Sequence, residues 1–150
     1  MKLTPEWVVG FVDGEGCFHV SVHRHPESSS GYQVLPEFVV VQHERDVQLL
    51  HALKAFFGCG VVRRHHGDRM VYRVRRQEHL AERILPFFEK HPLKSRKRVD
   101  FIRFRRVVLL MERGAHLTPE GLERIRSIVA RMRERSPKRE SRPCGNTGGS

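Results

Sequence analysis

Hydrophobic and polar residues follow two different periods along the chain, and each period predicts a different kind of element. Thr4–Glu6 has the residue types that begin a helix: a capping hydroxyl, a proline at the first helical position and an acid in the first turn. The apolar run Trp7–Val12 follows. We expect Gly14 and Gly16 to end this helix, because glycine is a common helix stop.

A half-buried strand is predicted next, because apolar and polar residues alternate along Cys17–His23. Segment 26–31 is rich in serine and contains proline and glycine, which favours a connecting loop. Gln33–His43 is rich in β-branched and aromatic residues, and this predicts a second strand with Phe38 and Val40 facing the core.

The same pattern of one helix and two strands follows once more, and further helices come after it. Their expected ranges are a helix over 46–57, a hairpin of strands over 61–66 and 69–76, and helices over 80–90, 97–113 and 118–135. The order predicts a mixed α+β fold. The last segment, 136–150, has too few apolar residues to pack and is expected to be a disordered basic tail outside a domain over 1–135.

Charge narrows the class of partner. Lys and Arg total 28 against 17 Asp and Glu, which gives a net charge of +11. Such an excess favours a polyanion, either nucleic acid or an anionic membrane surface. Because no apolar run approaches the roughly 20 residues of a membrane span and no signal peptide precedes Leu3, we expect nucleic acid rather than a membrane. The three cysteines are far apart and odd in number, which favours a reducing compartment inside the cell. For a nucleic-acid partner, we expect the protein to lie with the genome, in a prokaryotic cytoplasm or nucleoid or in an organelle.

Polar side chains on the first strand allow a second hypothesis. Cys17, His19, His23 and His25 could share one face and hold a metal ion. Zinc sites usually take ligands from two elements, however, so surface polar residues are the favoured interpretation.

Arginines gather in the second hairpin and alternate there with apolar residues. Arg69, Val71, Arg73 and Arg75 should share one face of the sheet, opposite the core. Arginine binds guanine or phosphate through two parallel hydrogen bonds, and a β-ribbon fits the major groove of DNA. We therefore favour a sheet that binds duplex DNA over a merely solvated basic surface.

Val8–Gly16 (VVGFVDGEG) resembles the nine-residue signature of the LAGLIDADG homing endonucleases. His91–Phe101 (HPLKSRKRVDF) is similar to a segment found late in many members, and the resemblance extends over about 3–133. It implies the αββαββα fold, with a saddle-shaped antiparallel sheet and helices on one face. The presence of one motif implies a homodimer.

In this family the signature helices of two subunits or halves pack together, so the resemblance implies a dimer interface at Trp7, Gly10, Phe11 and Gly14. Glu15 would then meet its counterpart near the two-fold axis. With Gly14, it would hold Mg²⁺ or Mn²⁺ against the scissile phosphates.

The resemblance also implies roles for residues outside the signature. Gln42 matches a polar residue near the catalytic water. Lys97 and Lys94 are both candidates for a basic residue that stabilises the transition state. We expect Asp13 to support the helix end rather than to act in catalysis. Base and phosphate contacts are expected from the outward-facing side chains of Ser21, His23, Gln33, Glu37, Arg63, His65, Arg69, Arg73 and Arg75.

The activity implied by the resemblance is metal-dependent hydrolysis of both strands of a long pseudo-palindromic DNA site. The alternative is an intron RNA maturase, or a DNA-binding regulator without cleavage, on the same fold. RNA is a possible partner only in the maturase case. The sequence leaves the target site open.

Overall fold

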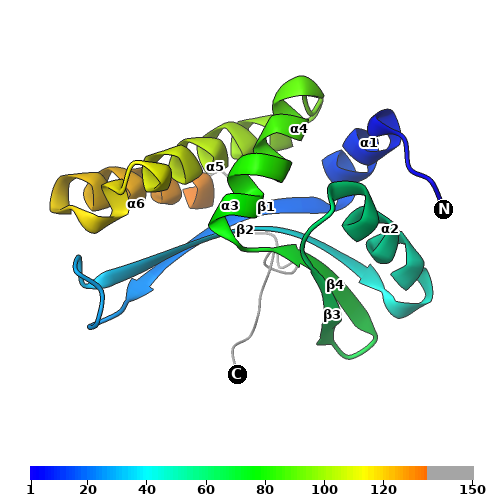
Figure 1. Cartoon of the computed structure of the whole chain (residues 1–150), viewed down its shortest axis with the longest axis horizontal. Helices are drawn as coiled ribbons and strands as arrows, with labels where there is room; N and C mark the ends of the chain where they lie inside the picture. Colours follow the sequence, from blue (N-terminus) through cyan, green and yellow to red (C-terminus); the bar gives the residue numbers. More distant parts are fainter. Residues whose placement is uncertain (135–150) are drawn as a thin grey trace.

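The computed structural model describes residues 1–134, and its framework is a four-stranded sheet in the order β1-β2-β4-β3 (Figure 1). All neighbouring strands run antiparallel. The strands are β1 (Gly16–Arg24), β2 (Tyr32–His43), β3 (Val61–His66) and β4 (Arg69–Val74). The predicted α+β class is confirmed, as is the helix–strand–strand order repeated twice. Segment 136–150, the predicted tail, lies outside the described residues.

Helix α1 (Pro5–Glu15) begins as the sequence predicts, with the Thr4 side chain accepting a hydrogen bond from the Trp7 amide. Its end differs from the prediction. Gly14 lies inside the helix, and the chain turns into β1 only at Gly16, whose backbone is extended. A glycine inside a helix costs only about 1 kcal/mol relative to alanine, so packing of the helix on the core can offset it.

The other helices follow the predicted ranges closely. Helix α2 (Val47–Phe57) comes after a short 3₁₀ turn at 44–46. One continuous helical segment runs through α3 (Gln77–His79), a π-helical turn over Leu80–Ile84, and α4 (Leu85–Lys90). It begins three residues before the predicted start. Helices α5 (Lys97–Glu112) and α6 (Pro119–Glu134), joined through a 3₁₀ turn at 115–117, complete the described chain.

The core lies between the sheet and these helices. Phe18 of β1 stacks on Phe38 of β2 with 5.1 Å between ring centroids, and it contacts Phe88 of α4 and Phe104 of α5. These four rings are almost fully buried. The alternation predicted for β1 is therefore confirmed, as is the inward orientation predicted for Phe38 and Val40 of β2.

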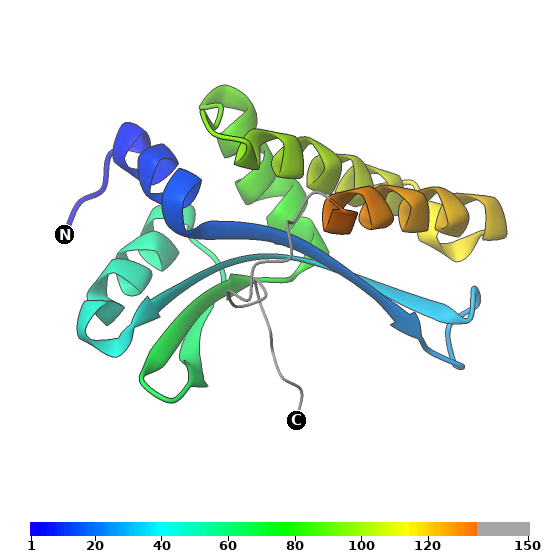
Figure 2. The same cartoon turned by 180° about the vertical axis from the view of Figure 1, so that it is seen from behind.

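The opposite face of the sheet carries the polar residues of the same alternation. Figure 2 shows the sheet arched from the β1–β2 turn to the β3–β4 hairpin, with every described helix on the outer side of the arch. Among the helices within residues 1–134, none is long and apolar enough to span a membrane.

Candidate active site and nucleic-acid interface

The junction of α1 with β1 presents an exposed carboxylate. Glu15 is the last residue of α1, and its side chain is exposed. Gln42, near the end of β2, donates from Nε2 to Glu15 Oε2 at 3.3 Å and to the Val41 carbonyl at 2.9 Å. The antiparallel pairing of β1 with β2 thus brings these two predicted site residues together, although they are 27 positions apart.

Asp13, two residues earlier, is fully engaged within the protein. Its Oδ2 accepts from the Lys94 amide at 2.8 Å, and its Oδ1 accepts from the Ser95 amide at 3.1 Å and the Ser95 hydroxyl at 2.7 Å. The Ser95 hydroxyl oxygen in turn accepts from the Lys97 amide at 3.2 Å. We call this set of bonds the Asp13 clamp. It ties the end of α1 to the beginning of α5, which agrees with the supporting role predicted for Asp13.

The surroundings of Asp13 favour its ionised form. Burial alone would raise the pKa of the Asp13 carboxyl. The hydrogen bonds from Lys94 and Ser95, together with the charge of Lys97, outweigh burial and hold this pKa below its ordinary value. Asp13 is therefore a charged acceptor whose oxygens are already occupied by the protein.

The two candidate lysines have different surroundings. Lys97 is half-buried, and burial lowers its pKa, while the charges of Asp100, Asp13 and Glu15 act in the opposite direction. Lys97 therefore lies within the electrostatic field of Glu15. Lys94 is exposed, and it contacts Asp13 through its backbone amide.

The outer face of α1 is apolar, and its two glycines leave it without side chains at two positions. Trp7 and Phe11 stack with 4.7 Å between ring centroids, and Trp7 is 39% exposed. Gly10 and Gly14 are exposed, and a methyl group built on either would have no atom within 4 Å. Because residues three and four apart share a helix face, these four residues form one surface.

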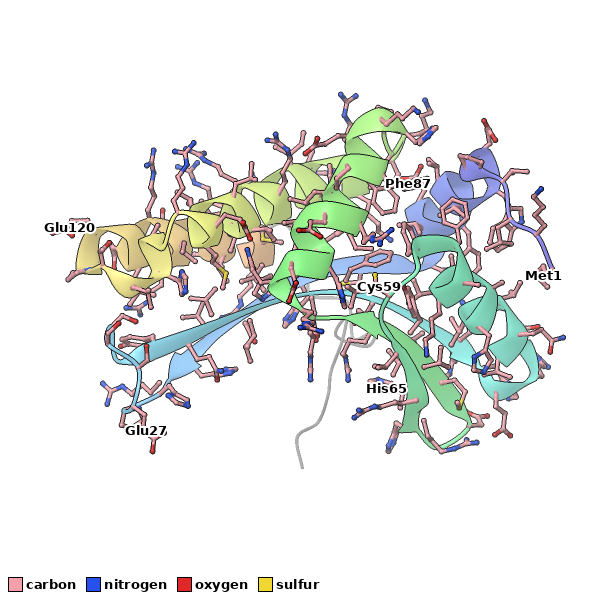
Figure 3. The ribbon with its side chains drawn as sticks, in the orientation of Figure 1. Met1, Glu27, Cys59, His65, Phe87 and Glu120 are labelled. Atoms are coloured by element: carbon pink, nitrogen blue, oxygen red, sulfur yellow. The ribbon has the colours of Figure 1, made fainter. Side chains whose placement is uncertain are left out.

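The predicted nucleic-acid contacts lie on the inner face of the arch or at its rim. The most exposed of them are His23, Gln33, Arg63 and Arg75, whereas Ser21, His65, Arg69 and Arg73 are half-buried. Figure 3 shows His65 of β3 beneath the arch. Arg75 lies just after β4 instead of inside it, because the strand ends at Val74 rather than at the predicted 76.

Glu37 lies on this face but is buried, with 6% of its side chain exposed. Its Oε2 accepts from Arg75 Nε at 2.7 Å and lies 3.3 Å from Arg73 Nε. Its Oε1 lies 3.6 Å from His19 Nδ1. Burial would raise the pKa of Glu37, but the neighbouring His19, the hydrogen bond from Arg75 and the two arginine charges lower it below its ordinary value.

The alternative metal site on β1 is not assembled. His19 is directed at Glu37 and not at another ligand. Within residues 1–134, no three His, Cys, Asp or Glu side chains are grouped so that they could hold a metal ion.

Sequence reasoning missed two features of these sites. The partners of Asp13 lie 81 and 82 positions away, so no local pattern indicates them. Arg76 and His79 join three of the predicted arginines around a cavity at the end of β4. The run of arginines indicated a basic surface here. The turn into α3, which brings Arg76 and His79 to the cavity, could not be predicted from composition.

The described chain thus combines an exposed acid at a helix end, a basic arched sheet and an apolar helix face in one mixed α+β fold. The family model described as LAGLIDADG endonuclease matches residues 8–108, and the chain belongs to this family.

Particular relatives agree with this assignment. The structure is similar to the crystal structure of the homing endonuclease I-TnaI, with a TM-score of 0.84 and 54% identity, covering 89% of this chain and 96% of that one. It is also similar to I-SmaMI bound to an uncleaved DNA target in the presence of calcium ions, with a TM-score of 0.84 and 32% identity, covering 87% of this chain and 45% of that one. In sequence, it is 36% identical over 118 residues to a 50.9 kDa protein of unknown function in ND4 intron 1 of Podospora anserina, which covers 77% of this chain. The chain spans 26% of that protein's length.

Proposed function

We propose that this protein is a site-specific homing endonuclease that hydrolyses both strands of a long pseudo-palindromic DNA site as a homodimer, with the help of divalent metal ions. The observation that carries the proposal is the position of Glu15. It is an exposed carboxylate at the end of the signature helix, beside Gln42 and within the field of Lys97.

The homodimer is supported by the outer face of α1. One chain supplies one exposed acid at this junction, and a two-fold axis along α1 would bring a second Glu15 to it. Gly10 and Gly14 leave room for the backbone of a second helix, and the exposed Trp7 would lose water contact in such a pair. The similar length of the I-TnaI chain is consistent with a single-motif subunit.

The donors at this junction fit a hard divalent cation. Glu15 offers carboxylate oxygens. The carbonyl of Gly14 belongs to the last turn of α1, where carbonyl groups receive no hydrogen bond from within the helix and can bind another group. Oxygen donors of this kind suit Mg²⁺ or Mn²⁺. When bound, such an ion supplies positive charge that stabilises the phosphate oxygens during hydrolysis.

The chain's own residues have distinct tasks in this proposal. Gln42 fixes the orientation of Glu15 through Nε2, and its amide oxygen can accept a hydrogen bond from a water molecule at the site. Lys97 stabilises the charge that develops on the phosphate, and its half-buried ammonium acts there with little screening by water. We favour Lys97 over Lys94 because Glu15 and Lys97 interact and because the Asp13 clamp holds the beginning of α5.

DNA would lie along the inner face of the arch. The phosphate contacts would release counterions, so affinity should fall steeply as salt rises. The proposed contacts are Ser21, His23, Gln33, Arg63, His65, Arg69, Arg73 and Arg75, with Glu37 beneath two of the arginines. We propose that the protein acts inside the cell, with the genome that carries its target, as an intron-encoded nuclease would.

The test is cleavage of a randomised plasmid library by wild type and by Glu15→Gln, with Mg²⁺ and with a chelator. Wild type with Mg²⁺ should linearise a defined subset of plasmids, and the other three conditions should not. Specific DNA binding without cutting in any metal would favour the non-cleaving regulator. Selective binding to a structured intron RNA in place of DNA would favour the maturase.

A further inference from the structure

The arginines of the DNA-facing sheet do not all have equal freedom, because Glu37 is bonded to two of them. The antiparallel register pairs Phe38 with Val74, which places Glu37 beside Arg75. The carboxylate is almost completely buried, whereas 49% of the Arg75 side chain is exposed. A buried acid on a surface meant for a polyanion is unfavourable for binding unless it has a specific task.

The atoms involved indicate that task. A guanidinium offers five N–H groups in a fixed planar fork. Arg75 uses Nε to donate to Glu37 Oε2 at 2.7 Å. The side-on fork, which needs Nε, is therefore occupied, and the end-on fork of the two Nη groups is the one that a ligand can receive.

The space next to these arginines is suited to a nucleic-acid group. A cavity of about 350 Å³ opens at the end of β4, and its basic walls are Arg63, Arg73, Arg75, Arg76 and His79. Within the described part of the chain, Nη2 of Arg73 is buried and has no hydrogen-bond partner, while Nε of Arg73 is ion-paired with Glu37 Oε2 at 3.3 Å. Buried donors of this kind are costly unless a ligand or water satisfies them.

We propose that Glu37 is a positioning residue for sequence recognition: it holds Arg75 by Nε so that the two Nη groups of Arg75 bind the O6 and N7 edge of one guanine in each half-site. This inference rests on the proposed binding of duplex DNA. It assigns Glu37 an indirect role, whereas the sequence alone suggested a direct contact.

The preference should follow from geometry rather than charge. An end-on arginine fork matches the two acceptors of guanine in the major groove, and adenine presents one acceptor and one donor there. Without the carboxylate, Arg75 would be free to rotate and would be repelled by Arg73, so it would bind any nearby phosphate. Affinity for DNA would then remain, while discrimination would fall.

The experiment is selection by binding from a duplex library with randomised positions, followed by sequencing. Wild type should select a site with a strong guanine preference at one position of each half-site. In Glu37→Gln that preference should fall by at least about fivefold, because a good bidentate contact contributes about that much or more to discrimination. Preferences at the other positions should stay.

Three variants make the result interpretable. Arg75→Lys keeps the charge but lacks the fork, so it should lose the same guanine preference. The double variant Glu37→Gln/Arg75→Lys should lose no more guanine preference than either single variant, because both changes disrupt the same Glu37–Arg75 pair. Glu44→Gln is the matched control, since Glu44 pairs with Arg64 at 2.8 Å on an exposed surface, and it should retain the wild-type preference. Thermal unfolding of each variant checks that it is folded.

Two outcomes overturn the inference while leaving DNA cleavage intact. One is an unchanged guanine preference in folded Glu37→Gln. The other is additive losses at two different positions, which would mean that Glu37 reads a base itself. If wild type selects no site at all, the proposed function fails, and this inference fails with it.

Discussion

The end of α1 and the middle of β2 both carry an acid, but the two acids have opposite surroundings. At the end of α1, Glu15 is exposed and has one long contact, at 3.3 Å, with Gln42. On β2, Glu37 is buried and lies within 3.6 Å of two arginines and a histidine. Asp13 belongs with Glu37, because protein donors already occupy both its oxygens. The difference separates an acid that is available to a ligand from acids that position other groups.

We expect the largest effect on the cleavage rate at Lys97, whose charge interacts with that of Glu15. Lys97→Met should lower the cleavage rate by about 10²–10³-fold, because it removes a preorganised charge from the transition state. Lys94→Met is the matched control and should change the rate by less than about threefold, because the backbone of Lys94 and not its side chain contacts the site. Single-turnover kinetics on the selected DNA site measure both. Equal losses in the two variants would contradict the distinction.

The Asp13 clamp should give the next largest effect. Asp13→Asn places an NH₂ group against a backbone N–H, and one amide donor then loses its acceptor. We expect a cost of about 0.5–1.5 kcal/mol in the free energy of unfolding, the net contribution of one hydrogen bond. We also expect a loss of roughly tenfold in cleavage rate at saturating DNA, since a small displacement of a catalytic group is costly.

Asp68→Asn is a control for the clamp, because Asp68 pairs with His43 on the exposed hairpin turn, 3.0 Å away. It should leave the cleavage rate unchanged. Chemical denaturation measures the free energy of unfolding, and single-turnover kinetics measure the cleavage rate. A folded Asp13→Asn protein with wild-type cleavage would show that the clamp does not position Lys97.

The apolar outer face of α1 gives a prediction in which two properties change in opposite directions. Gly10→Ala and Gly14→Ala should stabilise the subunit by about 0.5–1 kcal/mol, because alanine favours the helix and its methyl group meets nothing within 4 Å. The same methyl groups should weaken dimerisation by at least about tenfold, because they keep two helices apart. Light scattering across a dilution series measures this, and tighter association would contradict the proposed interface.

The smallest effect concerns pH. The pKa of Glu37 lies below its ordinary value of 4.5, so its ion pairs stabilise the fold above that pH and are lost as pH falls through the lowered pKa. The groups that face it are His19 of β1, Arg73 of β4, Arg75 just after β4 and the nearby His65 of β3. The free energy of unfolding should therefore fall more steeply below about pH 4.5 in wild type than in Glu37→Gln. Parallel curves for the two proteins would contradict the assignment.

Periodicity and capping predicted most of the fold because they are local properties. The alternation in Cys17–His23 and the cap at Thr4 depend on neighbouring residues alone, and both are confirmed. Gly14 was wrongly expected to end α1, because packing on the core outweighed a small local preference.

The site was only partly predictable. The family resemblance indicated Glu15 and Gln42, and the structure brings them together. The Asp13 clamp and the burial of Glu37 depend on contacts between segments far apart in the sequence, which no local pattern encodes. The choice between Lys94 and Lys97 also required the three-dimensional position of the beginning of α5.

The central claim is that two copies of Glu15 form the cleavage site, and mixed dimers test it directly. Wild type and Glu15→Gln would be co-expressed in known ratios, and double-strand cleavage of the selected site would be measured. If both subunits are needed, activity follows the square of the wild-type fraction and falls to about a quarter at equal amounts. A linear decrease, to about a half at equal amounts, would mean that each chain cuts on its own and would contradict the account.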